Sequence, residues 1–324
     1  MYDVIGDIHG QAEKLEGLLK LMGYEPQGFG YRAPFGRKAV FLGDLIDRGP
    51  GQMRVLEIVR AMVESGDAMC IMGNHEFNAV GYATADPFNP GERLRPNRAD
   101  TVKCRKNREQ HAEFLEQVGE GSADYLAWIE WFKTLPPFMD LGRIRVVHGC
   151  WDDESVATLN AGGWGQHTPL THEVLLEICR LVEKGKESTM MKARKLLTCG
   201  LELDLPEGRV ILDKSDHPHK EIRIANWRDW AKQLHEVALI PAGQEEQLHG
   251  MEWPADLVIS KIEGAPVFVG HHWFSGHPII ESPKLACLDW SAAKDGPLVA
   301  YRWDGEAELS NESLIWVGKL AAHA

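Results

Sequence analysis

Short apolar stretches alternate with amphipathic ones at the start of the chain. Residues 2–6 and 38–42 have the composition of buried strands, and each is followed by a stretch, 11–22 and then 53–65, whose apolar residues recur at helical spacing. A third apolar stretch, 67–72, follows the second of these helices. This alternation predicts right-handed crossover connections and a sheet that begins with parallel strands.

Each of these three predicted strands ends in a glycine or runs into one, and polar residues follow. In chain order the polar groups are Asp7 and His9, then Asp44, Asp47 and Arg48, and then Asn74 and His75. Because the carboxyl ends of parallel strands meet at one edge of a sheet, where open α/β sheets bind their ligands, we expect the three groups to converge. Taken singly, Asp7 would also fit a helix cap, and Asp47 with Arg48 a surface ion pair. The repetition favours a site.

Two later strands end in the same way. The predicted strand 143–147 runs into His148, and the strand 266–269 runs into Gly270 and His271. A lone histidine after a strand is usually structural, but these two occupy the same topological place as the three earlier groups. Further elements are predicted as helices over 109–118, 123–134, 171–184 and 188–197 and as strands over 285–288 and 298–303.

Two regions interrupt this regular pattern. The stretch from about 77 to 108 is predicted to be a long insertion, and it is locally basic although the chain as a whole is acidic. Its basic residues are Arg93, Arg95, Arg98, Lys103, Arg105, Lys106 and Arg108. This charge cluster is either a solvated surface or an overhang that attracts an anionic substrate. Residues of about 152–263 follow no clear period and are predicted to form a cap-like insertion. The whole of 1–324 is expected to be a single domain with these two insertions.

Composition limits the classes of protein to be considered. With 44% apolar and 26% charged residues, the chain is typical of soluble globular proteins. It has no run of about 18 apolar residues and no signal-like start, so we expect a cytoplasmic protein without a membrane partner. The formal net charge of -13 argues against general nucleic-acid binding, which rests on many lysines and arginines. Six cysteines without a C-x-x-C pair indicate reduced thiols.

The side chains at the strand ends carry carboxylates, an amide and imidazoles, but no thiolate. This donor set suits Mn²⁺, Fe or Zn²⁺ in a hydrolytic site and fits neither a structural zinc site nor an iron–sulfur cluster. The number of donors favours two ions. A pair of ions about 3.5–4 Å apart needs a bridging carboxylate and activates a shared water for attack at phosphorus.

The motifs G-D-x-H-G, G-D-x-x-D-R-G, G-N-H-E, H-G and G-H occur here in that order. The set resembles the calcineurin-like metallophosphoesterases, and its D-R-G and N-H-E forms resemble the phosphoprotein phosphatase branch, which includes bacterial protein phosphatases and diadenosine tetraphosphatases. The first three motifs are complete within residues 6–76, and the middle insertion is not covered. The resemblance implies a four-layer α-β-β-α sandwich with a central pair of mixed sheets and a helical cap insertion.

The resemblance also implies a set of metal ligands. Asp7 and His9 would bind the first ion, Asp44 would bridge, and Asn74, His148 and His271 would hold the second ion. Two divalent ions are expected, Mn first, with Fe or Zn as alternatives. The family's H-G-G form is replaced by His148-Gly149-Cys150, and the last ligand is either His271 or His272. His271 directly follows the glycine and matches better.

The remaining roles concern the phosphorylated substrate. The resemblance implies that His75, oriented by Asp47, protonates the leaving alkoxide and that Arg48 clamps phosphate oxygens. A second phosphate-binding arginine of the family is assigned to Arg223, and Asn74 is counted with Arg48 and Arg223 among the expected substrate-binding residues. The expected activity is hydrolysis of phosphomonoesters by in-line attack of a metal-bound hydroxide, with phosphorylated Ser/Thr proteins as first substrate. The alternatives are a diadenosine polyphosphate or other nucleotide phosphohydrolase, and an inert metal-binding scaffold.

Overall fold

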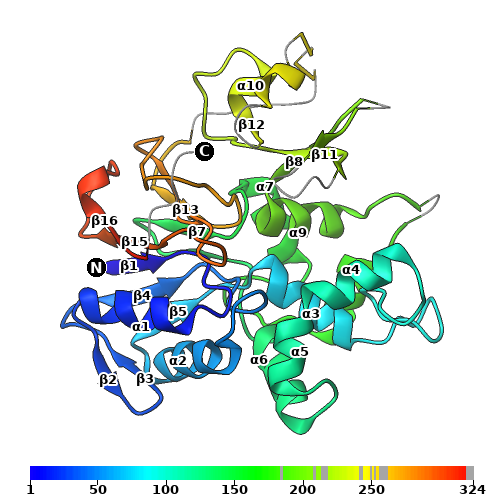
Figure 1. The fold of residues 1–324 in the computed structure, drawn as a ribbon, viewed down its shortest axis with the longest axis horizontal. Coiled ribbons are helices and arrows are strands. Elements are labelled where there is room, and N and C mark those ends of the chain that lie inside the picture. Colours follow the sequence, from blue (N-terminus) through cyan, green and yellow to red (C-terminus); the bar gives the residue numbers. More distant parts are fainter. Residues whose placement is uncertain are drawn as a thin grey trace.

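The structure is a computed structural model, and Figure 1 shows its two main β-sheets between layers of helices. It describes residues 1–182, 185–206, 209–212, 218–240, 244–248, 250–251, 253–254 and 262–318. In the described part of the chain, no helix has both the length and the apolar character needed to cross a membrane.

The first sheet has the strand order β16-β15-β1-β4-β5. Its strands are β1 (Tyr2–Ile5), β4 (Lys38–Phe41), β5 (Ala68–Cys70), β15 (Leu298–Trp303) and β16 (Leu314–Val317). β1, β4 and β5 are parallel, whereas β15 is antiparallel to both of its neighbours. The predicted parallel start is therefore confirmed, and the sheet as a whole is mixed.

The second sheet has the order β14-β13-β7-β6. Its strands are β6 (Phe138–Asp140), β7 (Arg145–Val147), β13 (Val267–Val269) and β14 (Leu285–Cys287). Only β6, which the sequence did not predict, is antiparallel. The two sheets face each other across one apolar cluster that includes Val4, Val40, Val146, Phe268 and Tyr301.

Helices cover the outer face of each sheet (Figure 1). α1 (Ala12–Leu21) and α2 (Gln52–Ser65) lie on the first sheet, and α7 (Asp153–Ala161) and α9 (Thr189–Cys199) lie on the second. The four-layer α-β-β-α arrangement expected from the sequence is therefore confirmed. It places the carboxyl ends of β1, β4, β5, β7 and β13 along one edge.

Further helices extend from this edge. They are α3 (Asn74–Ala83), α4 (Val102–Gln110), α5 (Ala112–Val118), α6 (Ala123–Lys133) and α8 (His172–Cys179). The predicted basic insertion, about 77–108, thus begins inside α3 and ends inside α4. A small hairpin joins β2 (Glu25–Gln27) to β3 (Gly30–Arg32).

The predicted cap insertion, about 152–263, contains more than helices. Besides α7, α8 and α9 it holds a three-stranded sheet of β8 (Leu201–Asp204), β11 (Glu221–Ile224) and β12 (Ala238–Leu239), together with α10 (Leu234–Val237). The cap also contains the strand pair β9 (Ile211–Leu212) and β10 (Pro218–His219) and the 3-10 helix Glu245–Leu248. A second 3-10 helix, Asn311–Ser313, lies outside the cap. The three-stranded sheet has an apolar cluster of its own, around Ile222, Ile224 and Leu234.

Parts of this predicted cap lie outside the described residues. These parts are 183–184, 207–208, 213–217, 241–243, 249, 252 and 255–261. The predicted helix 171–184 ends in one of them, and its described part is helical only to Cys179.

Candidate metal centre

The strand ends bring the predicted polar residues together at one edge of the paired sheets. Asp7 follows β1, Asp44 follows β4, His148 follows β7 and His271 follows β13. These four side chains and His9 are each at most 6% exposed. Burying several ionisable groups is costly unless their charges are compensated, so their convergence makes this edge a candidate cation site.

Asp44 lies at the centre of this cluster. Its Oδ1 accepts a hydrogen bond from the backbone N–H of His75 at 3.0 Å and lies 3.3 Å from His148 Nε2. Its Oδ2 lies 3.5 Å from His9 Nε2. Two compact triads of potential ligand atoms, each within 4.8 Å, share this carboxylate: His9–Asp44–His75 and Asp44–His148–His271. A shared carboxylate between two triads is the geometry that two neighbouring cations require.

Backbone carbonyls orient the rings of two of the histidines. His9 Nδ1 donates to the Ile46 carbonyl at 2.8 Å, and His148 Nδ1 donates to the Leu42 carbonyl at 2.6 Å. Each ring therefore directs its Nε2 toward Asp44. Metal-binding histidines are oriented in this way by a hydrogen bond from the other ring nitrogen.

An amide oxygen lies beside the second triad. Asn74 Oδ1 lies 2.7 Å from His271 Nδ1 and 3.1 Å from His148 Nε2. His271 Nε2 and Asp7 Oδ1 are buried without a hydrogen-bond partner, although Asp7 Oδ2 accepts the His271 N–H at 3.0 Å. Asp7 belongs to neither compact triad of the described residues. The unpartnered Oδ1 of Asp7 is nevertheless available to coordinate an ion.

The electrostatics of the cluster favour an added positive charge. Burial, together with the carboxylates of Asp289 and Asp44, raises the pKa of Asp7 well above its ordinary value. Burial lowers the pKa of His148, but Asp44 and Asp7 outweigh it and raise that pKa to about 10. Burial and the nearby Arg48 lower the pKa of His9 to about 3, so that ring is neutral and able to bind a metal. The donor set therefore fits divalent cations.

The backbone is strained where it presents these side chains. Seven non-glycine residues of the described chain have positive φ, and five of them are the site residues His9, Asp44, Asp47, Arg48 and His271. Each such conformation costs about 1–2 kcal/mol for an ordinary L-residue. The concentration of strain at one edge supports a functional origin, since packing alone would not select these positions.

Two glycines are required by close approach to the carboxylates. A Cβ on Gly73 would lie 2.2 Å from Asp44 Oδ1, and a Cβ on Gly270 would lie 2.1 Å from Asp7 Oδ1. Larger residues at these positions would displace the two carboxylates. The glycines that precede the predicted ligands are thus part of the site's geometry.

Glu76, the last residue of the N-H-E motif, holds the Asp44 loop in place. Its Oε2 accepts the N–H groups of Asp44 at 2.8 Å and Gly73 at 3.0 Å, and its Oε1 accepts the N–H of Leu45 at 2.8 Å. The side chain is fully buried. It joins the ends of β4 and β5 and therefore fixes the position of Asp44.

We expect Glu76→Gln to destabilise the metal-free protein by about 1–3 kcal/mol, because either orientation of the amide sets its NH₂ against a backbone N–H. Urea unfolding measures this change. The exposed Glu116, changed to Gln, is the matched control. Equal midpoints for the two variants would contradict the role of Glu76.

Asp47 lies between two histidines. His75 Nδ1 is 2.5 Å from Asp47 Oδ2, and His111 Nδ1 is 3.0 Å from Asp47 Oδ1. Burial raises the pKa of Asp47, but the two histidines outweigh it and lower that pKa to about 2. Sequence reasoning missed His111, because it lies at the junction of α4 and α5 and follows no strand or glycine.

A cavity of about 540 Å³ lies beside His75. It is lined by Arg48, Asn74, His75, Asn78, Glu109, Gln110, Glu113 and Arg223. Both predicted phosphate-binding arginines therefore face one space, and Arg223 Nη1 donates to the His271 carbonyl at 2.9 Å. His272 is turned away, with its Nε2 3.3 Å from the Gly149 carbonyl and its ring against Trp227.

Several basic residues of the insertion bind neighbouring groups and do not face this cavity, unlike the overhang that would attract an anionic substrate. Arg105 pairs with Asp100, Arg98 with Glu120, and Arg108 Nη1 donates to carbonyls of the insertion itself. None of the seven basic residues lines the cavity. The residues that line it from α4 and α5 are Glu109, Gln110 and Glu113. That wall is acidic and amide-bearing.

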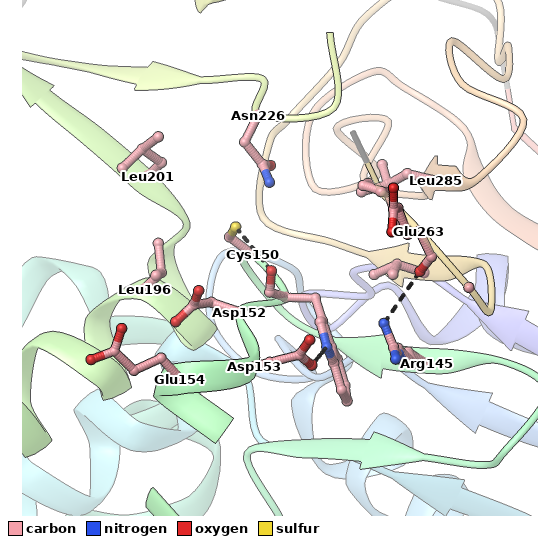
Figure 2. A pocket seen from close by; sticks show the side chains of 14 residues that line it. Arg145, Cys150, Asp152, Asp153, Glu154, Leu196, Leu201, Asn226, Glu263 and Leu285 are labelled. Carbon is pink, nitrogen blue, oxygen red and sulfur yellow. Dashed lines mark hydrogen bonds between the residues drawn. The ribbon is translucent and has the colours of Figure 1, made fainter. Parts of the chain in front are cut away.

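A second cavity, of about 700 Å³, lies beyond the His148 loop. In Figure 2, Asp152, Asp153 and Glu154 line it on one side and Arg145 with Glu263 on the other. Arg145 Nη1 donates to the Glu263 carbonyl at 3.5 Å, and its guanidinium stacks on Trp151. None of the predicted site residues lines this cavity.

A family model described as calcineurin-like phosphoesterase matches residues 2–173. Among curated proteins, the bis(5'-nucleosyl)-tetraphosphatase PrpE of Halalkalibacterium halodurans is 42% identical over 74 residues, which are 23% of this chain and 30% of that protein. The PrpE protein of Bacillus subtilis is 31% identical over 106 residues, 33% of this chain and 43% of its own. The chain thus covers less than half the length of either relative.

Solved structures are similar at low TM-scores. A putative diadenosine tetraphosphatase has a TM-score of 0.44 at 16% identity, covering 99% of this chain and 94% of its own. A protein serine/threonine phosphatase from Saccharomyces cerevisiae has a TM-score of 0.45 at 13% identity, covering 100% of this chain and 80% of its own.

Proposed function

The chain belongs to the calcineurin-like phosphoesterase family, and from this premise we propose that it is a phosphoesterase that hydrolyses phosphomonoesters with two divalent metal ions. One observation carries the proposal: the buried carboxylate of Asp44 is shared by two triads of potential ligands. An inert scaffold would have no need for the His75–Asp47 pair and two arginines beside such a centre.

We assign one ion to Asp7, His9 and Asp44 and the other to Asp44, Asn74, His148 and His271. Mn²⁺ is the first candidate, and Fe or Zn²⁺ also suits oxygen and imidazole donors. When bound, the two ions supply an activated water and neutralise charge on the phosphate. The cluster's buried, unpartnered atoms on Asp7 and His271 support this assignment.

The chain's own residues bind the phosphate and move the proton. Arg48 and Arg223 line the cavity beside His75, and guanidinium groups bind phosphate oxygens in pairs. His75 has its Nδ1 held by Asp47, which leaves Nε2 to carry a proton to the departing oxygen. Asp47 remains ionised and stabilises the charged ring.

For the substrate we propose a phosphorylated protein side chain first and a nucleotide polyphosphate second. The wall formed by Glu109, Gln110 and Glu113 favours a leaving group with hydrogen-bond donors or positive charge and disfavours additional phosphates. The second candidate rests on the PrpE relatives, which are named as bis(5'-nucleosyl)-tetraphosphatases.

A direct assay distinguishes these functions. Metal-loaded protein is incubated with p-nitrophenyl phosphate, a phosphopeptide and diadenosine tetraphosphate, before and after His75→Ala. We expect turnover of p-nitrophenyl phosphate and the phosphopeptide that falls in the variant. No turnover of any substrate with Mn²⁺ would contradict the proposal and favour the inert scaffold.

We expect the double variant Glu109→Gln/Glu113→Gln to favour diadenosine tetraphosphate. Its kcat/KM for this substrate, divided by its kcat/KM for p-nitrophenyl phosphate, should rise by about 2- to 10-fold. Removing two carboxylates relieves repulsion of the additional phosphates, and each exposed charge contributes about 1 kcal/mol or less. Steady-state kinetics at low salt measure the ratio, and Glu116→Gln on α5 is the matched control. An unchanged ratio would show that this wall does not select substrates.

A further inference from the structure

His111 belongs to none of the motifs, yet it contacts Asp47, the partner of the proposed proton donor His75. Its Nδ1 lies 3.0 Å from Asp47 Oδ1 and 2.9 Å from Asp47 Oδ2. The ring is only 1% exposed and packs edge-on against Tyr82, with ring centroids 5.3 Å apart. It therefore has a fixed place between α4 and α5.

The hydrogen bonds define which atoms carry protons. Asp47 is ionised and can only accept, so the facing Nδ1 atoms of both His75 and His111 must donate. His111 Nε2 is buried and has no partner among the described residues. A protonated Nε2 would need an acceptor there, so the ring is neutral with its single proton on Nδ1.

Asp47 is held both at its carboxylate and at its backbone. His111 donates to it from the α4–α5 junction, and the backbone N–H of Asp47 donates to Gln52 Oε1 at 2.7 Å. The Gln52 contact fixes the backbone of Asp47, and the His111 contact restricts rotation of its side chain. Without His111, the carboxylate would lose a partner and gain freedom to turn away from His75.

We propose that His111 is a positioning residue: by fixing Asp47, it sets the orientation of the His75 ring and aims His75 Nε2 into the cavity. This inference rests on the proposed phosphoesterase function. His75 Nε2 lies 3.8 Å from Asp44 Oδ2, and His75 lines the cavity with Arg48 and Arg223. A small rotation of this ring would misdirect the proton without changing phosphate binding.

The leaving group separates this role from a general structural one. Phenyl phosphate has a basic leaving group that needs a proton, whereas 2,4-dinitrophenyl phosphate does not. We expect His111→Ala to lower kcat for phenyl phosphate by about 10- to 100-fold, a part of the usual general-acid contribution, and kcat for the dinitrophenyl ester by less than about threefold. KM for both should change little.

Two further variants control for packing. His111→Asn places an amide N–H near the position of Nδ1 and should restore kcat for phenyl phosphate to within about threefold of the wild type. His111→Phe keeps an aromatic ring against Tyr82 but donates nothing, and it should behave like His111→Ala. Equal losses for both esters, or Asn no better than Phe, would overturn the proposal.

A spectroscopic measurement on metal-free protein is independent of activity. Histidine labelled with ¹⁵N reports which ring nitrogen carries the proton, and we expect His111 as the Nδ1–H tautomer. His111 as the Nε2–H tautomer would overturn the proposal even if the variants were impaired. If the wild type hydrolyses neither ester, the proposed function fails, whereas the tautomer of His111 still tests the positioning contact separately.

Discussion

Asp44→Asn is expected to reduce kcat/KM more than any other single change of a proposed metal ligand. Asp44 is the only residue shared by the two triads found among the described residues, so its loss affects both ions. The reduction should exceed the roughly 10- to 100-fold that follows when a residue that only orients a ligand is changed. Steady-state kinetics at saturating Mn²⁺ measure it.

The comparison with His148→Ala makes this prediction specific. His148 belongs to only one triad, so its loss should weaken one ion and spare the other. Titration calorimetry should find both sites weakened in Asp44→Asn and one site weakened in His148→Ala. The exposed Asp124, changed to Asn, is the control for loss of a carboxylate. If His148→Ala were the more damaging change, Asp44 would not be the bridging ligand.

His75→Ala is expected to lower kcat by about 10²–10⁴-fold, the usual contribution of a general acid, with KM little changed. The effect should be largest for phenyl phosphate and smallest for the dinitrophenyl ester. The Asp47 contact at 2.5 Å supports this role, since it holds Nδ1 and leaves Nε2 free.

His75 also lies in a triad with His9 and Asp44, so it has an alternative role as a metal ligand. Elemental analysis separates the two roles. We expect His75→Ala to retain two ions per chain. Loss of one ion, or the same drop in kcat for both esters, would place His75 among the ligands and remove the general acid from the account.

The sequence predicted the core of the site because its signal is local and repeated. Asp7, Asp44 and Asn74 each follow a glycine at the end of a short apolar strand, and parallel strands must bring such ends to one edge. His148 and His271 were found by the same reasoning, although they lie far along the chain. In the structure these residues share hydrogen bonds and buried surroundings.

Other parts could not be predicted, for physical reasons that differ. His111 acts across the fold from a helix junction, and its sequence neighbours are ordinary helix residues. Glu109 and Glu113, four residues apart, have the pattern of a solvated helix surface. The arginines of the insertion count as positive charge in the sequence, but local pairing, such as Arg105 with Asp100, uses several of them.

The small sheet of the cap was also missed. β8 and β11 alternate in burial, but each is only four residues long, and their sheet covers a separate small cluster around Ile222. Four alternating residues are the shortest run that indicates a strand, and the long-range antiparallel pairing, here Ile222 with Leu203, cannot be recognised from the sequence of either strand alone.

Anomalous diffraction from crystals of the Mn²⁺-loaded protein locates the proposed pair of ions. We expect two peaks on either side of the Asp44 carboxylate, one beside His9 and one beside His148 and His271. A single peak that does not contact Asp44, or no peak at this edge of the sheets, would contradict the two-metal account.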